Sequence, residues 1–385
     1  MDCRRLSLTN FRNYRRLEID LAPGWTLIQG ANAQGKTNLL EAIYFLATSR
    51  APRASADREL VTWQALAEPQ PFMRTAGEVQ RRGRRVKIDI TVAPRPDGGE
   101  AASTKRIRIN EVPRRAVDLV GNLAVVFFSP ADVNIVDGAP SNRRRYLDIT
   151  NSQVDPRYLA ALQRFGKVVT QRNHLLRRIR DRRAKPGELG FWDQQLVNEG
   201  HYLVEQRRTT VDRLNEHAAR HHQALCPQET LSVRYLPSVS AENGGGLDRE
   251  GWLHRLSQLR DREMALGQSV MGPHRDDLSF AINGNDVAHF GSRGQQRSVA
   301  LSLKLAEAAF MTETLDDPPV LLLDDMMSEL DRGRRDRILA DILPTHQVLL
   351  TATDVDVFPP EFLARAERYQ VESGLLRAVE RPVTG

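Results

Sequence analysis

The chain has 385 residues, of which 55 are Lys or Arg and 49 are Asp or Glu, giving a net charge of +6. This length allows two or three domains with a substantial core, and the basic balance permits a polyanionic partner without requiring one. The two cysteines, Cys3 and Cys226, exclude a disulfide framework, and apolar runs no longer than buried strands predict a cytoplasmic protein without a membrane span.

The first 45 residues predict two edge strands, a third strand and a helix. After the apolar run 25–28, the segment GANAQGKT fits GxxxxGK(S/T) at every fixed position and leads into a helical stretch at 38–46. Glycines let the backbone turn with its N–H groups inward, Lys36 reaches the β- and γ-phosphates, and the Thr37 hydroxyl ligates Mg²⁺. The sequence therefore predicts a nucleotide site made of Gly30, Ala31, Asn32, Ala33, Gln34, Gly35, Lys36 and Thr37.

A strand-rich zone follows. Residues 86–92 and 105–109 alternate between apolar and polar side chains, and the prolines and glycines at 94–99 predict the turn between them. Residues 123–128 are continuously apolar, which is typical of a strand buried on both faces.

The period then changes to that of a helix. Apolar residues recur at helical spacing over 155–183 and again over 191–225, and Lys185, Pro186 and Gly187 interrupt them. We predict an antiparallel helical hairpin inserted into a sheet protein. The glycine-rich residues 241–246 predict a flexible loop within this insert.

Two further segments carry candidate chemistry. Small residues at 290–298 open a strongly helical stretch, so that Ser292 is either a plain helix cap or part of an anion site. The apolar strand at 319–323 ends in Asp324 and Asp325, where phosphate-loop enzymes place one acid on Mg²⁺ and another beside the attacking water. The alternative is a strand that runs into a charged turn.

The ordered set GANAQGKT, GSRGQQR and LLLDDMMSELD resembles the ABC-type ATPase heads of the SMC group. More closely, LTNFRNY, FFSPADVNIVDGAPSNRRRYLD, GPHRDD and SELD resemble the RecF family of bacterial recombination and repair ATPases, from the first strand to about Thr353. We therefore expect an α/β fold: an ABC-type ATPase head with a mixed sheet, formed by residues 1–132 and 276–385, and an α-helical lid at 133–275.

The resemblance implies that the phosphate loop of one subunit and the GSRGQQR signature of another enclose one ATP. Ser292, Gly294 and Gln295 then bind the nucleotide across a homodimer interface that also contains Asp331. Lys36 and Asp325 are the expected catalytic residues, and Thr37 and Asp324 the expected Mg²⁺ ligands. Arg12 matches an arginine near the phosphates, although a basic residue between two strands can equally face solvent.

Three departures from the usual motifs of ABC-type ATPases predict an ATP-controlled switch rather than a motor that hydrolyses ATP rapidly. The signature has Arg293 where glycine is usual and Gly291 where leucine is usual. Asp325 replaces glutamate, and its carboxylate is one methylene shorter, so hydrolysis should be slow. The familiar glutamine is missing from 128–132, and the segment 351–353 stands where many ABC proteins have a histidine.

Basic clusters provide the candidate DNA contacts, because phosphate binding needs clustered cations without base-specific geometry. Besides the arginines named below, basic clusters lie at 114–115, 143–145 and 177–185. Any of these clusters can instead be a solvated face of the protein. The predicted DNA-contact residues are Arg81, Arg82, Arg84, Arg85, Arg106 and Arg108.

The resemblance implies an ATP-induced homodimer that binds single- and double-stranded DNA near gaps or junctions. It also implies weak, DNA-stimulated ATP hydrolysis and RecR and RecO as partners in loading RecA, within DNA replication, repair and the SOS response. The alternative is the ATPase subunit of a membrane transporter. The sequence gives no role to His274 or Asp276.

Overall fold

The computed structural model describes residues 1–94, 103–240, 246–342 and 347–379. The predicted turn at 94–99 and the predicted flexible loop at 241–246 lie largely outside these residues. The chain forms two compact units: Met1–Asp132 with Glu307–Gly385, and Val133–Ala306. Within the described ranges, none of the helices combines the length and apolar character that crossing a membrane requires.

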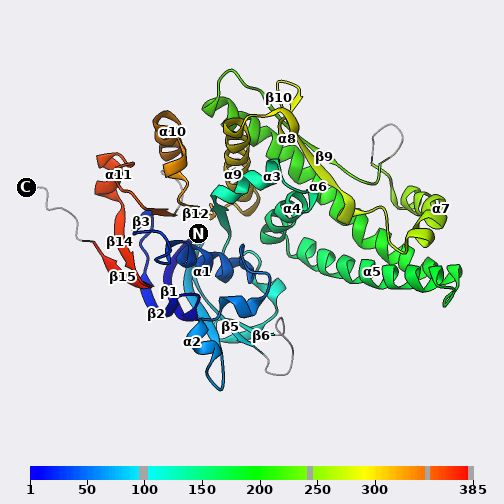
Figure 1. Ribbon diagram of the computed structural model, residues 1–385, viewed down its shortest axis with the longest axis horizontal. Coiled ribbons are helices and arrows are strands. Elements are labelled where there is room, and N and C mark those ends of the chain that lie inside the picture. The colour runs from blue at the N-terminus through cyan, green and yellow to red at the C-terminus, as the bar shows by residue number, and fades with distance from the viewer. Residues whose placement is uncertain (95–102, 241–245, 343–346, 380–385) are drawn as a thin grey trace, which may run out of the picture. The chain divides into compact units, whose positions relative to one another are not determined.

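The first unit contains an antiparallel sheet with the strand order β2-β1-β4-β5-β6-β7 (Figure 1). β1 lies between β2 and β4, so the prediction that it is an edge strand is wrong, whereas β2 does lie at an edge. Alternate side chains of β1, including Leu6 and Leu8, are fully buried, which gives the strand a core face. The strands are β1 Asp2–Phe11, β2 Tyr14–Asp20, β4 Met73–Arg81, β5 Arg84–Pro94, β6 Ser103–Ile109 and β7 Val112–Arg114.

The second sheet of this unit has the order β15-β14-β3-β13-β12-β8. Its strands from β14 to β8 are parallel, and β8, β12 and β13 are apolar on both faces, as parallel strands covered on both sides require. The strands are β3 Trp25–Gln29, β8 Val125–Phe128, β12 Val320–Asp324, β13 Val348–Ala352, β14 Glu367–Glu372 and β15 Leu375–Ala378. This α/β unit, formed by both ends of the chain, confirms the predicted fold class.

The parallel register explains where the candidate site forms. Asp324 pairs with Thr351, and Ala352 pairs with Gln29, so β12, β13 and β3 end at the same edge of the sheet. Ligands of open parallel sheets bind at this carboxyl edge. The helices of the unit are α1 Lys36–Thr48, α2 Trp63–Leu66, α10 Arg332–Ile342 and α11 Pro360–Arg365, with short 3₁₀ turns at Asp57–Leu60, Ala116–Leu119, Pro130–Asp132 and Met327–Glu329.

The second unit is centred on a long helical hairpin, as predicted. α5 Pro156–Arg180 and α6 Leu189–Leu225 pack antiparallel and are joined by a 3₁₀ turn at Pro186–Glu188 (Figure 1). α7 packs against both through Trp252, and a Cβ at Gly200 of α6 would lie 2.8 Å from that ring, so this close approach requires glycine. The other helices are α3 Val133–Val136, α4 Pro140–Val154, α7 Arg249–Leu266, α8 Val287–Phe290 and the first part of α9 Arg293–Leu315.

The same unit also contains a three-stranded sheet, β11-β10-β9, which sequence reasoning did not anticipate. Its strands are β9 Leu231–Leu236, β10 Asp277–Ile282 and β11 Asn285–Asp286, and a 3₁₀ turn spans Pro273–Arg275. The predicted lid boundary at 275 therefore lies inside this compact unit, which continues to Ala306. The division into lid and head stays a prediction.

Two buried arginines connect the elements of this unit. Arg172 of α5 pairs with Asp193 of α6 at 2.8 Å and with Glu263 of α7 at 2.5 Å. Arg207 of α6 donates to Asp148 at 2.8 Å and to Asp276 at 3.2 Å. Buried charges of this kind are tolerated because each is paired and hydrogen-bonded. Asp276, which the sequence left without a role, thus connects α6 to the turn before β10.

Candidate nucleotide-binding site

The segment between β3 and α1 has a backbone that two glycines make possible. Gly30 and Gly35 have φ values of 155° and 116°. A Cβ at Gly30 would lie 2.5 Å from the carbonyl oxygen of Val371, and a Cβ at Gly35 would lie 2.4 Å from Nδ2 of Asn13. Gly30 therefore excludes a side chain by conformation and by contact with backbone, whereas Gly35 excludes one by its conformation.

The loop leads into the N-terminal end of α1, which is suited to bind an anion. Gly35 is the N-cap of α1 and supplies no side chain to bond the first N–H groups. Those N–H groups and the helix dipole favour an anion at this end. Ala33, with a φ of 64°, adds a left-handed turn of the type that points successive N–H groups inward. The geometry fits a phosphate group.

Lys36 lies folded over the same loop. Its Nζ donates to the carbonyl oxygen of Gly30 at 2.6 Å and to that of Ala31 at 3.0 Å. Burial lowers the pKa of Lys36, and the charges of Asp325 and Asp324 oppose that shift. The ammonium group is thus held at the mouth of the loop by carbonyl oxygens, the same kind of acceptor that phosphate oxygens provide.

Asp324, at the end of β12, completes a cluster of hard oxygen donors. Its Oδ1 accepts from Thr37 Oγ1 at 2.7 Å and from Thr351 Oγ1 at 2.9 Å. Burial raises the pKa of the Asp324 carboxyl, although the hydrogen bonds from Thr37 and Thr351 oppose the shift. Neighbouring oxygens of an octahedral Mg²⁺ site lie about 3 Å apart. The separation of Thr37 and Asp324 therefore suits the predicted Mg²⁺ ligands.

Asp325 follows in a left-handed conformation, with a φ of 48°. This conformation costs a non-glycine residue about 1 kcal/mol or more and needs support. Thr351 Oγ1 accepts from the Asp325 N–H at 2.9 Å, and Ser328 Oγ donates to the Asp325 carbonyl oxygen at 2.8 Å. Ser328 Oγ also lies 3.2 Å from Asp325 Oδ1. The role of this carboxylate beside the attacking water stays a prediction.

Arg12 lies beside the loop and is firmly held. Its Nε and Nη2 donate to the two carboxylate oxygens of Glu41 at 2.8 and 3.1 Å, and its Nη1 donates to the carbonyl oxygen of Glu59 at 2.9 Å. The Glu41 side chain is fully buried in α1. The guanidinium group is therefore positioned by the same helix that the phosphate loop opens.

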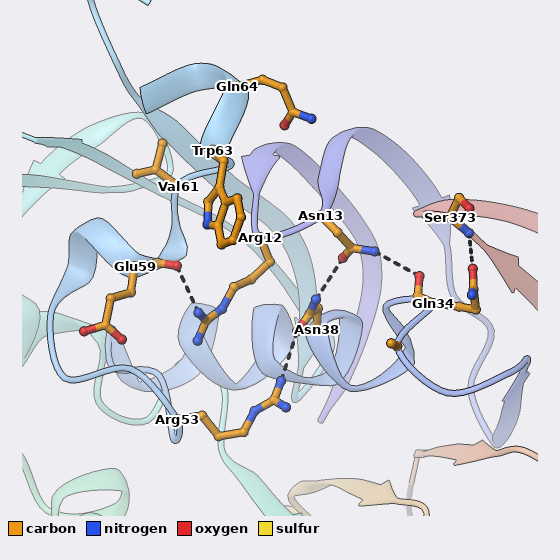
Figure 2. A pocket seen from close by; sticks show the side chains of 11 residues that line it. Arg12, Asn13, Gln34, Asn38, Arg53, Glu59, Val61, Trp63, Gln64 and Ser373 are labelled. Atoms are coloured by element: carbon orange, nitrogen blue, oxygen red, sulfur yellow. Dashed lines mark hydrogen bonds between the residues drawn. The ribbon is translucent and has the colours of Figure 1, made fainter. Parts of the chain in front are cut away.

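A pocket of about 710 Å³ adjoins the loop, and Arg12, Asn13, Gln34, Asn38 and Trp63 contribute to its lining. Figure 2 shows the Trp63 ring next to Arg12, with Asn13 joined to Gln34 and Asn38 by hydrogen bonds. Trp63 is 87% exposed, although it is the largest type of apolar side chain. An exposed aromatic ring in a pocket beside a phosphate site can stack a nucleobase.

The signature segment belongs to the second unit and forms a capping box at the start of α9. The Gln295 N–H donates to Ser292 Oγ at 3.2 Å, and the Ser292 N–H donates to Gln295 Oε1 at 2.9 Å. The serine is therefore a helix cap, and its hydroxyl hydrogen remains available to an acceptor. Gln295 Nε2 also donates to Glu229 at 2.9 Å.

Two neighbours of Ser292 bear on its predicted role. Gly294 has open space around it, because a Cβ there would meet only Ser292 Oγ, at 3.9 Å. Nothing within its own unit therefore requires glycine at this position. The side chain of Arg293 is 79% exposed and pairs with Asp137 at 2.9 Å, so the extra cation of this signature is partly neutralised.

Asp331 lies in the first unit, where it caps α10. Its Oδ1 accepts from the Arg334 N–H at 3.0 Å, and its side chain is 62% exposed. An exposed cap is compatible with the predicted interface position, which stays a prediction.

The six candidate DNA-contact residues have three kinds of surroundings. Arg82 donates to the carbonyl oxygen of Leu315, and Arg85 lies 3.6 Å from Glu78, so both have partners within the unit. Arg106 and Arg108 are exposed on β6, and Arg108 faces Asp89 of β5. Arg81 is half-buried at the end of β4, and Arg84 is exposed at the start of β5.

Sequence reasoning missed the roles of Thr351 and Trp63. Thr351 lies in the segment 351–353, where the resemblance led us to note a missing histidine, and its hydroxyl contacts both Asp324 and Asp325. The parallel pairing of β12 and β13 was the signal that could have placed it there. Nothing in the local sequence marks Trp63.

Proteins of known family are similar to this chain over almost its whole length. The family model described as RecF/RecN/SMC N terminal domain matches residues 3–359. The chain is 47% identical to the DNA replication and repair protein RecF of Chloroflexus aurantiacus, over 96% of this chain and 97% of the relative. It is 38% identical to the protein of the same name from Halalkalibacterium halodurans, over 98% and 99%.

Solved structures give the same picture. The chain is similar to the recombination mediator protein RecF-ATP in the RecFOR pathway, with a TM-score of 0.86 and 31% identity over 98% of this chain and 97% of that one. A second structure, RecF-ATPrS, matches with a TM-score of 0.87 and 29% identity over 98% of both chains. An Smc head bound to the C-winged helix domain of ScpA shares the fold, with a TM-score of 0.54 and 15% identity, over 100% of this chain and 98% of that one.

Proposed function

The chain belongs to the RecF family of SMC-like ATPases, and on that premise we propose that it is an ATP-controlled DNA clamp of replication and recombinational repair. The observation that carries the proposal is the assembly, at one sheet edge, of the glycine loop, Lys36 and the Thr37–Asp324 oxygen pair. That set binds a Mg²⁺-nucleotide.

The ligand is ATP, as in the solved RecF-ATP structure. Lys36 exchanges the carbonyl oxygens of Gly30 and Ala31 for phosphate oxygens, and Thr37 with Asp324 holds Mg²⁺ directly or through water. The adjoining pocket accepts the nucleoside, with the base stacked on Trp63. Mg²⁺ neutralises the phosphate charge, and the protein positions the groups around it.

A second copy of the chain completes the site. Ser292 keeps a free hydroxyl hydrogen, and a Cβ added at Gly294 would meet only Ser292 Oγ, at 3.9 Å. Both features suit a γ-phosphate presented by another subunit, and Asp331 adds to the same interface. Bound ATP thus holds the two subunits of a homodimer together, and a monomer hydrolyses ATP poorly.

Hydrolysis resets the clamp and is slow. Asp325 orients or deprotonates the water, and its short side chain limits its reach. The segment 128–132 contains no glutamine to assist: its Ser129 N–H instead donates to Asp132 at 2.7 Å. DNA stimulates the reaction by favouring the closed dimer.

The dimer binds single- and double-stranded DNA near gaps or junctions, in the cytoplasm, and acts with RecR and RecO to load RecA. The RecFOR pathway of the solved relatives supports these partners. Exposed Arg106 and Arg108 are the favoured phosphate contacts among the candidate residues. The alternative of a transporter subunit loses its support, because RecF relatives match almost the whole chain.

Sedimentation of wild type and Lys36→Arg tests this function, with and without ATP and gapped DNA. We expect wild type to dimerise with ATP and to bind DNA more tightly as a dimer, because linkage between the two ligands is reciprocal. Lys36→Arg, which keeps the charge and loses the compact ammonium group, should dimerise less. A wild-type monomer under every condition would exclude the clamp.

A further inference from the structure

Three side chains that bind transition metals lie together where α6 ends. His222 and Cys226 are four residues apart and therefore share one face of the helix end. Glu229 follows in a tight turn, in which its N–H donates to the carbonyl oxygen of Cys226 at 3.0 Å. One donor atom from each residue lies within 4.8 Å of the other two. The wide spacing of the two cysteines along the chain did not predict this group.

The hydrogen bonds of His222 leave one ring nitrogen facing a carboxylate. Ser302 Oγ donates its only hydrogen to the carbonyl oxygen of Ser298 at 2.8 Å, so it accepts from His222 Nδ1 at 3.2 Å. The proton of the neutral imidazole is then on Nδ1, and the lone pair of Nε2 points at Glu229 Oε2, 2.9 Å away. A lone pair and a carboxylate oxygen at this distance repel each other unless a proton or a metal cation lies between them.

The arrangement matches that of histidines that bind metals in proteins. Such histidines donate one ring N–H to a neighbouring oxygen, which fixes the ring and frees the other nitrogen for the metal. Here the ring is fully buried, and Ser302 is the neighbouring oxygen.

We propose that His222, Cys226 and Glu229 bind one Zn²⁺ ion. Imidazole, thiolate and carboxylate are its usual protein ligands, at about 2.0 to 2.3 Å. Around a tetrahedral ion such donors lie roughly 3.3 to 3.8 Å apart. The His222–Glu229 pair is already close to that separation, and all three donor atoms lie within 4.8 Å of one another. Binding therefore requires the half-buried Cys226 and Glu229 side chains to move closer together. Three protein ligands leave a fourth position for water.

The site shares Glu229 with the signature segment. One carboxylate oxygen faces His222, and the other accepts from Gln295 Nε2 at 2.9 Å. A bound ion therefore fixes the carboxylate that orients Gln295, the partner of Ser292 in the capping box. The metal site itself does not depend on the proposed ATP clamp, and its test needs no nucleotide.

Cobalt titration of the metal-free full-length protein tests the site. Co²⁺ bound to a thiolate gives a near-ultraviolet charge-transfer band that surface histidines cannot produce. We expect the band to saturate at one Co²⁺ per chain and to disappear when Zn²⁺ displaces it. Cys226→Ser should lose the band, and Ser302→Ala, which removes the oxygen that orients His222, should weaken binding roughly 10- to 100-fold.

Cys3→Ser is the matched control, because Cys3 and Cys226 are the only cysteines of the chain. Cys3 lies in the other unit and is fully buried, and burial raises its pKa to about 12, so it should form no thiolate–metal bond. The band should persist in this variant. A wild type without the band, or a Cys226→Ser variant that keeps it while circular dichroism shows both folded, would overturn the proposal.

Discussion

Gly294→Ala should weaken the proposed dimer interface without lowering the free energy of unfolding of the chain. Gly294 is the second residue of α9, and a Cβ there would meet nothing closer than Ser292 Oγ at 3.9 Å. Alanine is better than glycine inside a helix by about 0.5 to 1 kcal/mol. The free energy of unfolding should therefore stay the same or rise by up to about 1 kcal/mol.

The same methyl group should weaken the ATP-bound dimer. In the proposed dimer, it crowds the γ-phosphate that the Gly294 N–H group is expected to bind. A hydrogen bond to a charged group contributes about 1.5 to 3 kcal/mol, and a symmetric dimer contains two such contacts. The dissociation constant of the dimer should rise roughly 10²- to 10⁴-fold. ATP binding by the monomer should not change, because the phosphate loop belongs to the other unit.

Sedimentation velocity over a concentration series with ATP measures the dissociation constant of the dimer, and urea unfolding measures the free energy of unfolding. Gly190→Ala is the matched control, because Gly190 is the second residue of α6 and has nothing within 4 Å of an added Cβ. The control should dimerise like wild type. A Gly294→Ala variant with an unchanged dimer constant would refute the reasoning.

Three further predictions follow from the structure. Trp63→Ala should change the free energy of unfolding by no more than about 0.5 kcal/mol, because the ring is 87% exposed. It should weaken ATP binding, measured by equilibrium dialysis, by the roughly 1 to 3 kcal/mol that stacking on a base contributes. An unchanged affinity for ATP would remove Trp63 from the site. Burial lowers the pKa of His274 from 6.5 to about 4, so its neutral form contributes stability that is full above pH 6.5 and is lost as the pH falls toward 4. In urea unfolding, wild type should lose about 3 kcal/mol more than His274→Gln over that range, and parallel curves would contradict the assignment. Arg106→Ala and Arg108→Ala should each reduce the salt slope of DNA binding by about 1, and slopes equal to that of wild type would place the phosphate contacts elsewhere.

The phosphate loop was predictable from sequence because its chemistry is local. Gly30, Gly35 and Lys36 act within one turn of backbone, so a fixed spacing carries the whole signal. Asp324 was predictable for a related reason, since a carboxylate at the end of an apolar strand falls at the ligand-binding edge of a parallel sheet.

The rest of the site depends on contacts between distant segments. Thr351 reaches Asp324 only because β12 and β13 pair in parallel with a particular register. Arg12 is positioned by Glu41, and nothing in the sequence pairs these two residues. β1 was misjudged as an edge strand because its neighbour β4 lies some sixty residues away along the chain.

The most direct test of the ATP clamp is photocrosslinking of the ATP-bound dimer with an ATP analogue that carries its reactive group on the γ-phosphate. Peptides from the dimer are then identified by mass spectrometry. The account predicts label on the signature segment, residues 292–297, that disappears when the protein is diluted to monomer. Label confined to residues 30–37 in a dimer shown to be intact would contradict it.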